Sequence, residues 1–386
     1  IIYLLYLANT ICSYLLIYKS AILIAKQKKY IVSQIEGKMV VLRLLIECII
    51  LIIFKQFIFY LIIDIFLVIL QNYWIARKAS KEYVVDKTVK KLERNEKKVI
   101  FSDIKALAMY QISGVVLSGT DSIIISSLLG TSLVGYLSYY KMIISQITGF
   151  LQQFFIAANA SIGNLAIEEK KETQYQLFQD INFIIFWITS FCSTCLYILF
   201  NPFIELWLGN EFILEENIVC ILVIDFYLTN MIRVVALFRT SNGLFIQGQY
   251  RPIIMAILNI VLSIILAFPL GIFGILLATV LSRVLTQTWY DPLLIYRNVF
   301  YKDVKEYYIK YSCYFLSTVI GTFLTELVVI QVGISNQILS FLTKVLICMI
   351  LPNVFIICVW NHTKEFQYVK KRIVNIGKGF LKRRSE

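Results

Sequence analysis

Five of the charged residues within the long apolar stretches of this chain stand out, because a charge there needs a partner or a task. Three are bases, Lys141, Arg233 and Arg283, and two are acids, Asp121 and Asp225. Ammonium and guanidinium groups hold anions through charge-assisted hydrogen bonds, and a guanidinium offers paired donors. A carboxyl group in surroundings of low dielectric can take up a proton or a metal cation unless a base neutralises it. These residue types therefore predict a site for an anion beside a site for a coupling cation.

Asp121 and Lys141 belong to a predicted helical hairpin over residues 100–165, with its turn at 129–132. Along each helix the polar residues fall on one face at about 100° per residue, and the other positions are apolar. This pattern is typical of a helix with lipid behind it and a wet cavity in front. On the first helix the polar face holds Gln111, Gly114, Ser118, Asp121 and Ser122, and on the second Ser138, Lys141, Ser145, Thr148, Gly149, Gln152 and Asn159. We expect these polar side chains to line the cavity: Gln111, Ser118, Ser145, Gln152 and Asn159.

Two of the buried bases also have a purely structural interpretation. Lys141 can form a salt bridge with Asp121 across the hairpin, because both residues lie at similar depth below the turn. Arg233 can pair with Asp225, two turns earlier on the same helix, or extend its side chain towards the membrane surface.

Two further arginines are candidates for holding an anionic head group. Arg283 shares a helical face with polar residues that follow it, Thr286, Gln287 and Tyr290, which favours a place in the cavity wall. Arg239 lies at the predicted inner boundary of the membrane, as does Arg251, where the orientation of the chain alone can explain a positive charge.

The composition places these residues in an all-α polytopic membrane protein. The chain is 59% hydrophobic and only 16% charged, whereas soluble domains carry about a quarter charged residues. Apolar runs of about 20 residues recur from end to end, and each is long enough to cross a bilayer as a helix. We expect about eleven transmembrane helices, at 1–24, 40–54, 57–75, 101–128, 132–165, 178–200, 213–238, 253–270, 273–296, 308–330 and 337–360.

The basic residues indicate the orientation of the chain. Lys and Arg concentrate in alternate loops and in the tail 361–386, while the loop 201–217 has four glutamates and no base. By the positive-inside rule the C-terminus is cytoplasmic. This distribution explains the net charge of +13, so we expect no nucleic-acid partner. The segments 77–98 and 361–386 either bind anionic lipids of the inner leaflet or only orient the protein.

The sequence offers no catalytic or metal-binding motif. The cysteines lie mostly inside apolar runs, where they pack as small side chains, and this includes the CxxC spacing of Cys192 and Cys195. His362 is the single histidine, and no P-loop is present. We therefore expect no enzyme activity, no metal and no cofactor, with H⁺ or Na⁺ as the coupling ion.

Several short motifs resemble one transporter family in their order and spacing. They are GTDSIIIS at 119–126, NASIGN at 159–164, PFIELWLG at 202–209, YRP at 250–252 and GIFG at 271–274. The set is similar to the polysaccharide-transporter branch of the multidrug/oligosaccharidyl-lipid/polysaccharide exporter superfamily, the repeat-unit flippases of O-antigen and capsule. The resemblance covers nearly the whole chain.

The resemblance implies a MATE-like transporter of two six-helix lobes around a central cavity. Residues 1–76 would be the remnant of an N-lobe lacking its first three helices, and 77–98 a basic cytoplasmic linker. Residues 99–297 would form the C-lobe, 298–360 two additional helices, and 361–386 a basic cytoplasmic tail. The implied substrate is an undecaprenyl-diphosphate-linked oligosaccharide, moved from the inner to the outer leaflet of a bacterial cell membrane. Membrane lipids and the polysaccharide polymerase and glycosyltransferases of the same pathway are the implied partners.

Other functions make different demands on the residues. A cation-coupled multidrug exporter of the same superfamily would have an acidic cavity, whereas Lys141, Arg233 and Arg283 favour an anionic substrate. A membrane glycosyltransferase or polymerase needs catalytic acids in a large outer loop, and the loop 201–217 is short. A scaffold without transport activity is the third alternative. Within the transporter hypothesis, Asp121 exchanges a cation against the substrate, and Asp225 is its counterpart or a charge partner.

Overall fold

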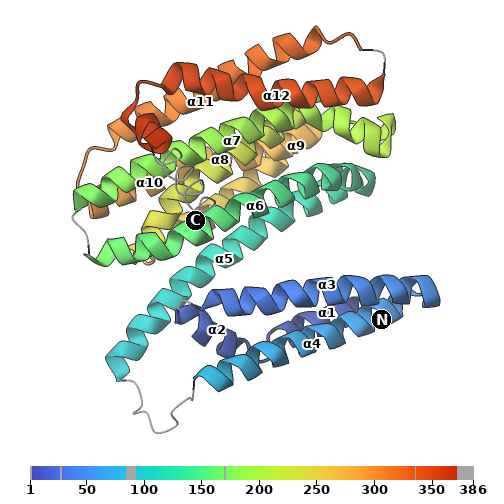
Figure 1. The fold of residues 1–386 in the computed structure, drawn as a ribbon, viewed down its shortest axis with the longest axis vertical. Helices are drawn as coiled ribbons and strands as arrows, with labels where there is room; N and C mark the ends of the chain where they lie inside the picture. The colour runs from blue at the N-terminus through green and yellow to red at the C-terminus, as the bar shows by residue number, and fades with distance from the viewer. Residues whose placement is uncertain (1, 27, 84–92, 169–170, 335, 372–386) are drawn as a thin grey trace, which may run out of the picture. The chain divides into compact units, whose positions relative to one another are not determined.

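The computed structural model describes residues 2–26, 28–83, 93–168, 171–334 and 336–371, and they are helical with no β-strand among them (Figure 1). The predicted all-α membrane fold is confirmed. Seven of the described helices are long and apolar enough to cross a membrane, or eight if a bent pair counts as one span. The chain divides into two compact units, Ile1–Glu93 and Arg94–Glu386.

The N-terminal unit begins with a helix that is broken in the middle. α1 (Ile2–Ser13) and α2 (Ile17–Ala25) meet at 43°, where a single span was predicted. A break in an apolar run leaves backbone carbonyls that need a donor. Asn72 of α4 (Phe57–Glu82) provides it, because its side-chain amide donates to the carbonyls of Cys12 and Ser13, both at 3.1 Å. Neither proline nor glycine marks this break, so it could not be predicted from the local sequence.

α3 (Lys29–Phe54) and α4 form an antiparallel hairpin that turns at Lys55 and Gln56. In the middle of α3, Arg43 pairs with Asp64 of α4 at 3.3 Å. At the end away from the turn, an ion pair between Lys28 and Glu82 joins the start of α3 to the end of α4. The two ion pairs therefore tie the helices together at the open end of the hairpin and midway along α3.

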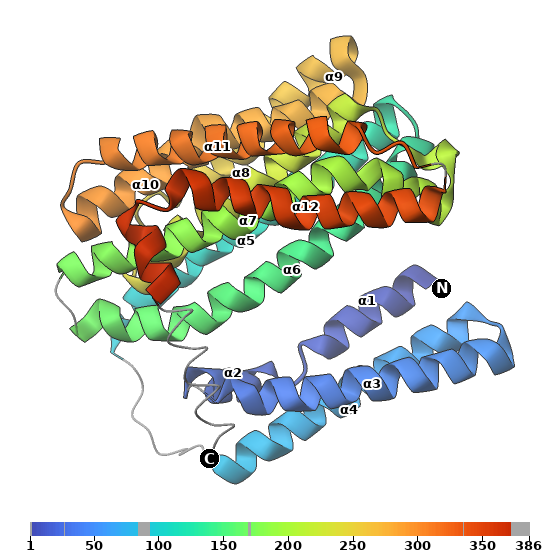
Figure 2. The same ribbon diagram turned by 45° about the horizontal axis from the view of Figure 1, so that its top comes forward.

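The C-terminal unit is a bundle in which α7 lies at the centre. α7 packs against α8 on one side and against α11 and α12 on the other, α5 packs along α9, and α6 contacts α8 (Figures 1 and 2). The helices are α5 (Arg94–Leu128), α6 (Thr131–Glu168), α7 (Lys171–Leu208), α8 (Glu216–Ser241), α9 (Arg251–Arg283), α10 (Trp289–Ile295), α11 (Lys305–Ile330) and α12 (Gln337–Trp360).

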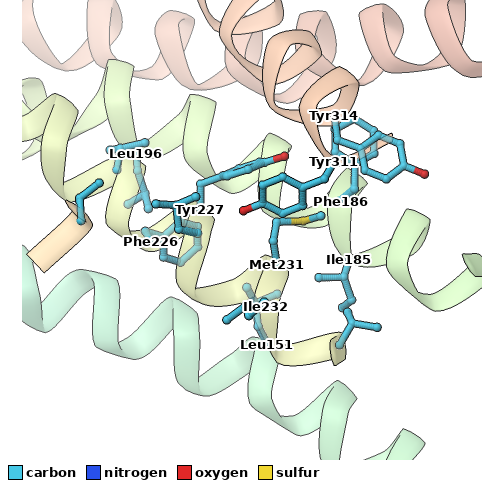
Figure 3. Packing of buried hydrophobic residues seen from close by; sticks show 14 of the residues in the cluster. Leu151, Ile185, Phe186, Leu196, Phe226, Tyr227, Met231, Ile232, Tyr311 and Tyr314 are labelled. Atoms are coloured by element: carbon cyan, nitrogen blue, oxygen red, sulfur yellow. The ribbon is translucent and has the colours of Figure 1, made fainter. Parts of the chain in front are cut away.

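Aromatic side chains dominate the core between α7, α8 and α11. Phe186 stacks on Tyr314 with 4.1 Å between the ring centroids, and Tyr227 meets Tyr311 at 6.4 Å (Figure 3). Met231 is fully buried beside them. Large rigid rings bury much apolar surface and prefer such offset and edge contacts. This core holds α8 and α7 in fixed register and so positions the charged residues that α8 carries.

The helical run from Arg251 to Phe300 folds back on itself at Gly271. Gly271 has φ 58° and ψ −137°, a backbone conformation that glycine adopts without strain. The side chain of Asn259 donates to the hydroxyl of Thr279 at 2.9 Å, although 20 residues separate them. In a straight helix this separation would be about 30 Å. The two arms therefore run antiparallel, which matches the two spans predicted at 253–270 and 273–296.

Gly274 lets the two arms touch, and we predict that Gly274→Ala destabilises the C-terminal unit. A Cβ at this position would lie 2.1 Å from the carbonyl oxygen of Leu266, a backbone atom that cannot move aside cheaply. Overpacking of this kind costs about 1–3 kcal/mol. The thermal unfolding midpoint of the detergent-solubilised chain should fall. Gly149→Ala is the control, because nothing lies within 4 Å of its Cβ, and an unchanged midpoint in both variants would refute the close contact.

Candidate functional site

A cavity of ≈350 Å³ lies between α5, α6, α8 and α9, entirely within the C-terminal unit. Four of the charged candidates line it: Asp121 from α5, Lys141 from α6, Asp225 from α8 and Arg283 from α9. The remaining wall is mostly apolar, apart from the hydroxyl of Thr279. The helices thus bring together two acids and two bases that lie up to 162 positions apart in the sequence, between 121 and 283.

Asp121 is the most enclosed of these groups. The residue is only 4% exposed, and both carboxylate oxygens lie 3.2 Å from the hydroxyl of Thr279, which donates to them. Asn259 in turn donates to the Thr279 hydroxyl, so the reversal at Gly271 assembles this network. A buried carboxylate beside a hydroxyl is a group that a proton or a small cation can neutralise.

Lys141 is held much more loosely. Its ammonium nitrogen lies 3.8 Å from Asp121 Oδ2, which is an ion pair but is longer than a hydrogen bond. The Lys141 side chain is 36% exposed, against 6% for Asp121. The salt bridge expected across the hairpin is therefore present, yet the ammonium group keeps donors free for an anion that enters the cavity.

Asp225 pairs with Arg283, so the pairing with Arg233 considered from the sequence is wrong for this structure. Arg283 Nε and Nη2 each lie 3.0 Å from Asp225 Oδ1. The sequence placed Arg233 and Asp225 on one helix, but the contact that forms is between α8 and the second arm of α9. Its partners are 58 positions apart, so local spacing could not reveal it.

Arg233 adds positive charge beside this pair. It is half-buried in α8, and Arg283 is near enough for the two positive charges to act on each other. In the described part of the chain no ion pair or hydrogen bond reaches Arg233. Lys141 and Arg283 balance the two acids in charge, so Arg233 gives the cluster an excess of one positive charge. The arrangement is suited to an anion.

Arg239 is placed away from the cavity, in a second buried cluster. Arg239 and Arg251 lie 3.3 and 3.0 Å from the two oxygens of Asp291, which is 1% exposed. The ring of Tyr110 covers Arg239 at 4.2 Å, and the Tyr110 hydroxyl donates to the carbonyl of Gly248. The cluster therefore ties α5 to α8, to the start of α9 and to α10. The sequence alone does not predict a role for Asp291, because its partners meet only in the folded bundle.

We predict that Asp291→Asn destabilises the C-terminal unit by about 3 kcal/mol, since it leaves two buried arginines without their anion. The readout is the thermal unfolding midpoint in detergent. Asp303→Asn is the matched control, because Asp303 is exposed and its contact is a hydrogen bond from the Lys305 amide. Equal midpoints for the two variants would contradict a structural role of Asp291.

The structure describes three of the five polar side chains that were predicted to line the cavity. Gln111, Ser145 and Gln152 are exposed, and none of them lines the cavity. The side chains of Ser118 and Asn159 lie outside the described residues. Two residues that do complete the site, Asn259 and Thr279, were missed. The available sign was the only amide of the first arm, Asn259, and the first polar side chain of the second arm, Thr279.

Comparison with known proteins supports the fold. No protein-family model and no curated protein matches the chain. A solved structure does: the lipid II flippase MurJ in an inward closed conformation, at a TM-score of 0.58 and 16% sequence identity. The match covers 82% of this chain and 64% of that one, so the chain spans less than two thirds of the length of its neighbour. The architecture described above is thus similar to that of a membrane transporter.

Proposed function

We propose that this chain contributes to moving an undecaprenyl-diphosphate-linked oligosaccharide from the inner to the outer leaflet of a bacterial cell membrane. The observation that carries this proposal is Lys141, a base of α6 that lines the cavity and pairs only loosely with Asp121, so that its ammonium group keeps donors free. A diphosphate is the anionic part of such a lipid, and it is the part most costly to bring into the bilayer. The solved neighbour is by its name a flippase for a lipid, which supports a lipid-linked substrate.

The substrate head group would first meet Lys141 and then the second base. The guanidinium of Arg283 lies across the same cavity. It contacts one carboxylate oxygen of Asp225 and donates to the side-chain oxygen of Gln287, so two of its five N–H groups stay available. Arg233 adds long-range attraction without lining the cavity. The rest of the wall is apolar, with residues such as Leu222, Phe226 and Leu276. These few charged groups would therefore contribute most of the binding energy for the head group. The glycan and the lipid tail would lie outside this cavity.

Asp121 is the proposed site of the coupling ion, H⁺ or Na⁺. It shares Lys141 with the substrate, because the same ammonium group pairs with the carboxylate and faces the cavity. A proton or cation that neutralises Asp121 would release Lys141 to bind a phosphate. Binding of the cation and binding of the anion are therefore linked, and each raises the affinity for the other. Linkage of this sign favours co-transport of the cation with the lipid over the exchange expected from the sequence, and alternating access of the transporter fold would convert it into transport.

A multidrug exporter is the alternative function, and the cavity does contain acidic residues of the kind that a cationic drug would need. Asp121 and Asp225 are each already paired with a base, however, and Arg233 leaves an excess of positive charge. A cationic drug would have to displace two bases. We therefore propose a transporter without enzyme activity that works beside the glycosyltransferases and the polymerase of its pathway, with its C-terminus in the cytoplasm.

The test uses a strain that lacks this gene and is complemented with the chain. Lipid-linked oligosaccharides are extracted, and the leaflet on which they accumulate is determined with an impermeant glycan-modifying enzyme. The proposal predicts accumulation on the inner leaflet in the deletion strain and its relief by the chain. Absence of accumulation together with altered drug tolerance would instead support the exporter.

A further inference from the structure

A strongly basic pocket lies in the N-terminal unit, at the end of the α3–α4 hairpin away from its turn. It has a volume of ≈430 Å³ and is bounded by the first turns of α3 and the last turns of α4. Its lining comprises Ile31, Gln34, Ile35 and Lys38 from α3, and Trp74, Arg77, Lys78 and Lys81 from α4. Four of the eight lining residues are thus basic and none is acidic.

The sequence builds this pocket from two identical helical spacings. The lining residues of α3 and those of α4 each follow the pattern i, i+3, i+4, i+7, which places them on one face of their helix. The antiparallel hairpin then sets the two faces side by side. The floor is firm, because Ile31 is 5% exposed and packs in a small core with Ile75 and Ala79. The basic side chains therefore project from a fixed surface.

Among the described residues, no acid forms an ion pair with the bases of the pocket. Two other lysines at this end have partners, since Lys28 pairs with Glu82 and Lys19 donates to the hydroxyl of Ser80. Throughout the described residues, no ion pair or hydrogen bond of this kind reaches the four pocket bases, Lys38, Arg77, Lys78 and Lys81. Like charges placed close together repel, so an anion in the pocket would relieve an existing cost.

The apolar part of the lining indicates which anion fits. Trp74 is 57% exposed at the rim, directly after the apolar run of α4, and Ile35 faces the same space. Tryptophan beside Lys and Arg at the end of a span is the arrangement found at the membrane–water interface. A phosphate with glycerol and acyl chains attached satisfies both parts of the lining. A free phosphate satisfies only the basic part.

We propose that this pocket binds the head group of an anionic phospholipid from the adjoining leaflet, with the phosphate between the bases and the glycerol against Trp74. Orientation by the positive-inside rule depends on how many bases a loop carries. The positive-inside rule does not require these bases to line one pocket together with a tryptophan. Lipid binding here would hold the cytoplasmic end of the α3–α4 hairpin at the membrane surface.

The fluorescence of Trp74 can be used to test this proposal. The full chain is reconstituted in phosphatidylcholine vesicles that contain brominated phosphatidylglycerol, whose bromines quench nearby tryptophans. The Trp74 signal is the difference between the chain and its Trp74→Phe variant. We expect brominated phosphatidylglycerol to quench this signal at a far lower fraction than brominated phosphatidylcholine. Arg77→Gln with Lys81→Gln should weaken this preference about 30-fold, from about 1 kcal/mol per basic residue near the surface.

Lys26→Gln with Lys29→Gln is the matched control, because it removes the same charge from exposed residues at the same end that do not line the pocket. The control should keep the preference for phosphatidylglycerol, and millimolar inorganic phosphate should not compete with the lipid. Equal quenching by the two lipids, equal loss in the two double variants, or full competition by inorganic phosphate would each overturn the proposal.

Discussion

Lys141→Gln is expected to reduce lipid-linked oligosaccharide transport to the level of vesicles without protein. The variant removes the ammonium group that faces the cavity and leaves the cavity shape nearly unchanged. A hydrogen bond to a charged group contributes about 1.5–3 kcal/mol, so loss of this contact should weaken head-group binding about 100-fold. The measurement is initial transport rate against substrate fraction in proteoliposomes.

The controls separate the charge of Lys141 from its structural role. Lys141→Arg keeps a cation and should retain most of the transport rate, because a guanidinium also binds phosphate. Lys141→Gln leaves Asp121 buried without its base, which destabilises the protein for reasons unrelated to transport. Adding Asp121→Asn should restore stability without restoring transport. Lys105→Gln removes an exposed charge of α5 away from the cavity and should have no effect. Full activity of Lys141→Gln would exclude it from the substrate path.

Asp121→Asn is expected to abolish the dependence of transport on the ion gradient. The amide oxygen can still accept from the Thr279 hydroxyl, so the network with Asn259 keeps its geometry. The side chain can no longer exchange a proton or hold a sodium ion, and Lys141 is permanently released. Head-group binding should therefore be as tight as in the native chain or tighter, while rates with and without an imposed gradient become equal.

Asp225→Asn provides the comparison for this prediction. Asp225 is also an acid of the cavity, but its side chain is 33% exposed and its partner Arg283 does not contact Asp121 in the described contacts. Transport by this variant should keep its response to the gradient. A full response to H⁺ and Na⁺ gradients in Asp121→Asn would rule out Asp121 as the coupling site.

The sequence predicted the contacts that depend on a short stretch of chain. The Asp121–Lys141 pair could be predicted because a short turn joins the two helices. Each residue lies a similar distance along its helix from this turn, and each lies on the polar face. The apolar runs likewise predict spans at 253–270 and 273–296, and the glycine between them marks the reversal. In these cases local geometry fixes the result.

The contacts that were missed depend on packing between distant helices. Asp225 meets Arg283, and Arg239 meets Asp291, only because α8 packs against the second arm of α9 and against α10. The residues of an apolar helix do not reveal which of its faces a neighbouring helix will cover. The same reason explains why Asn259 and Thr279 were not recognised as companions of Asp121.

In the proposed function, the cavity around Lys141 carries the anionic head group of a lipid across the membrane. The most direct measurement reconstitutes the full chain in vesicles loaded on one leaflet with a fluorescent undecaprenyl-diphosphate oligosaccharide. An impermeant quencher then follows the appearance of the label on the other leaflet. We expect protein-dependent translocation that Lys141→Gln eliminates and Lys141→Arg retains. Translocation at the native rate in Lys141→Gln, in protein that is correctly folded and inserted, would contradict the proposed function.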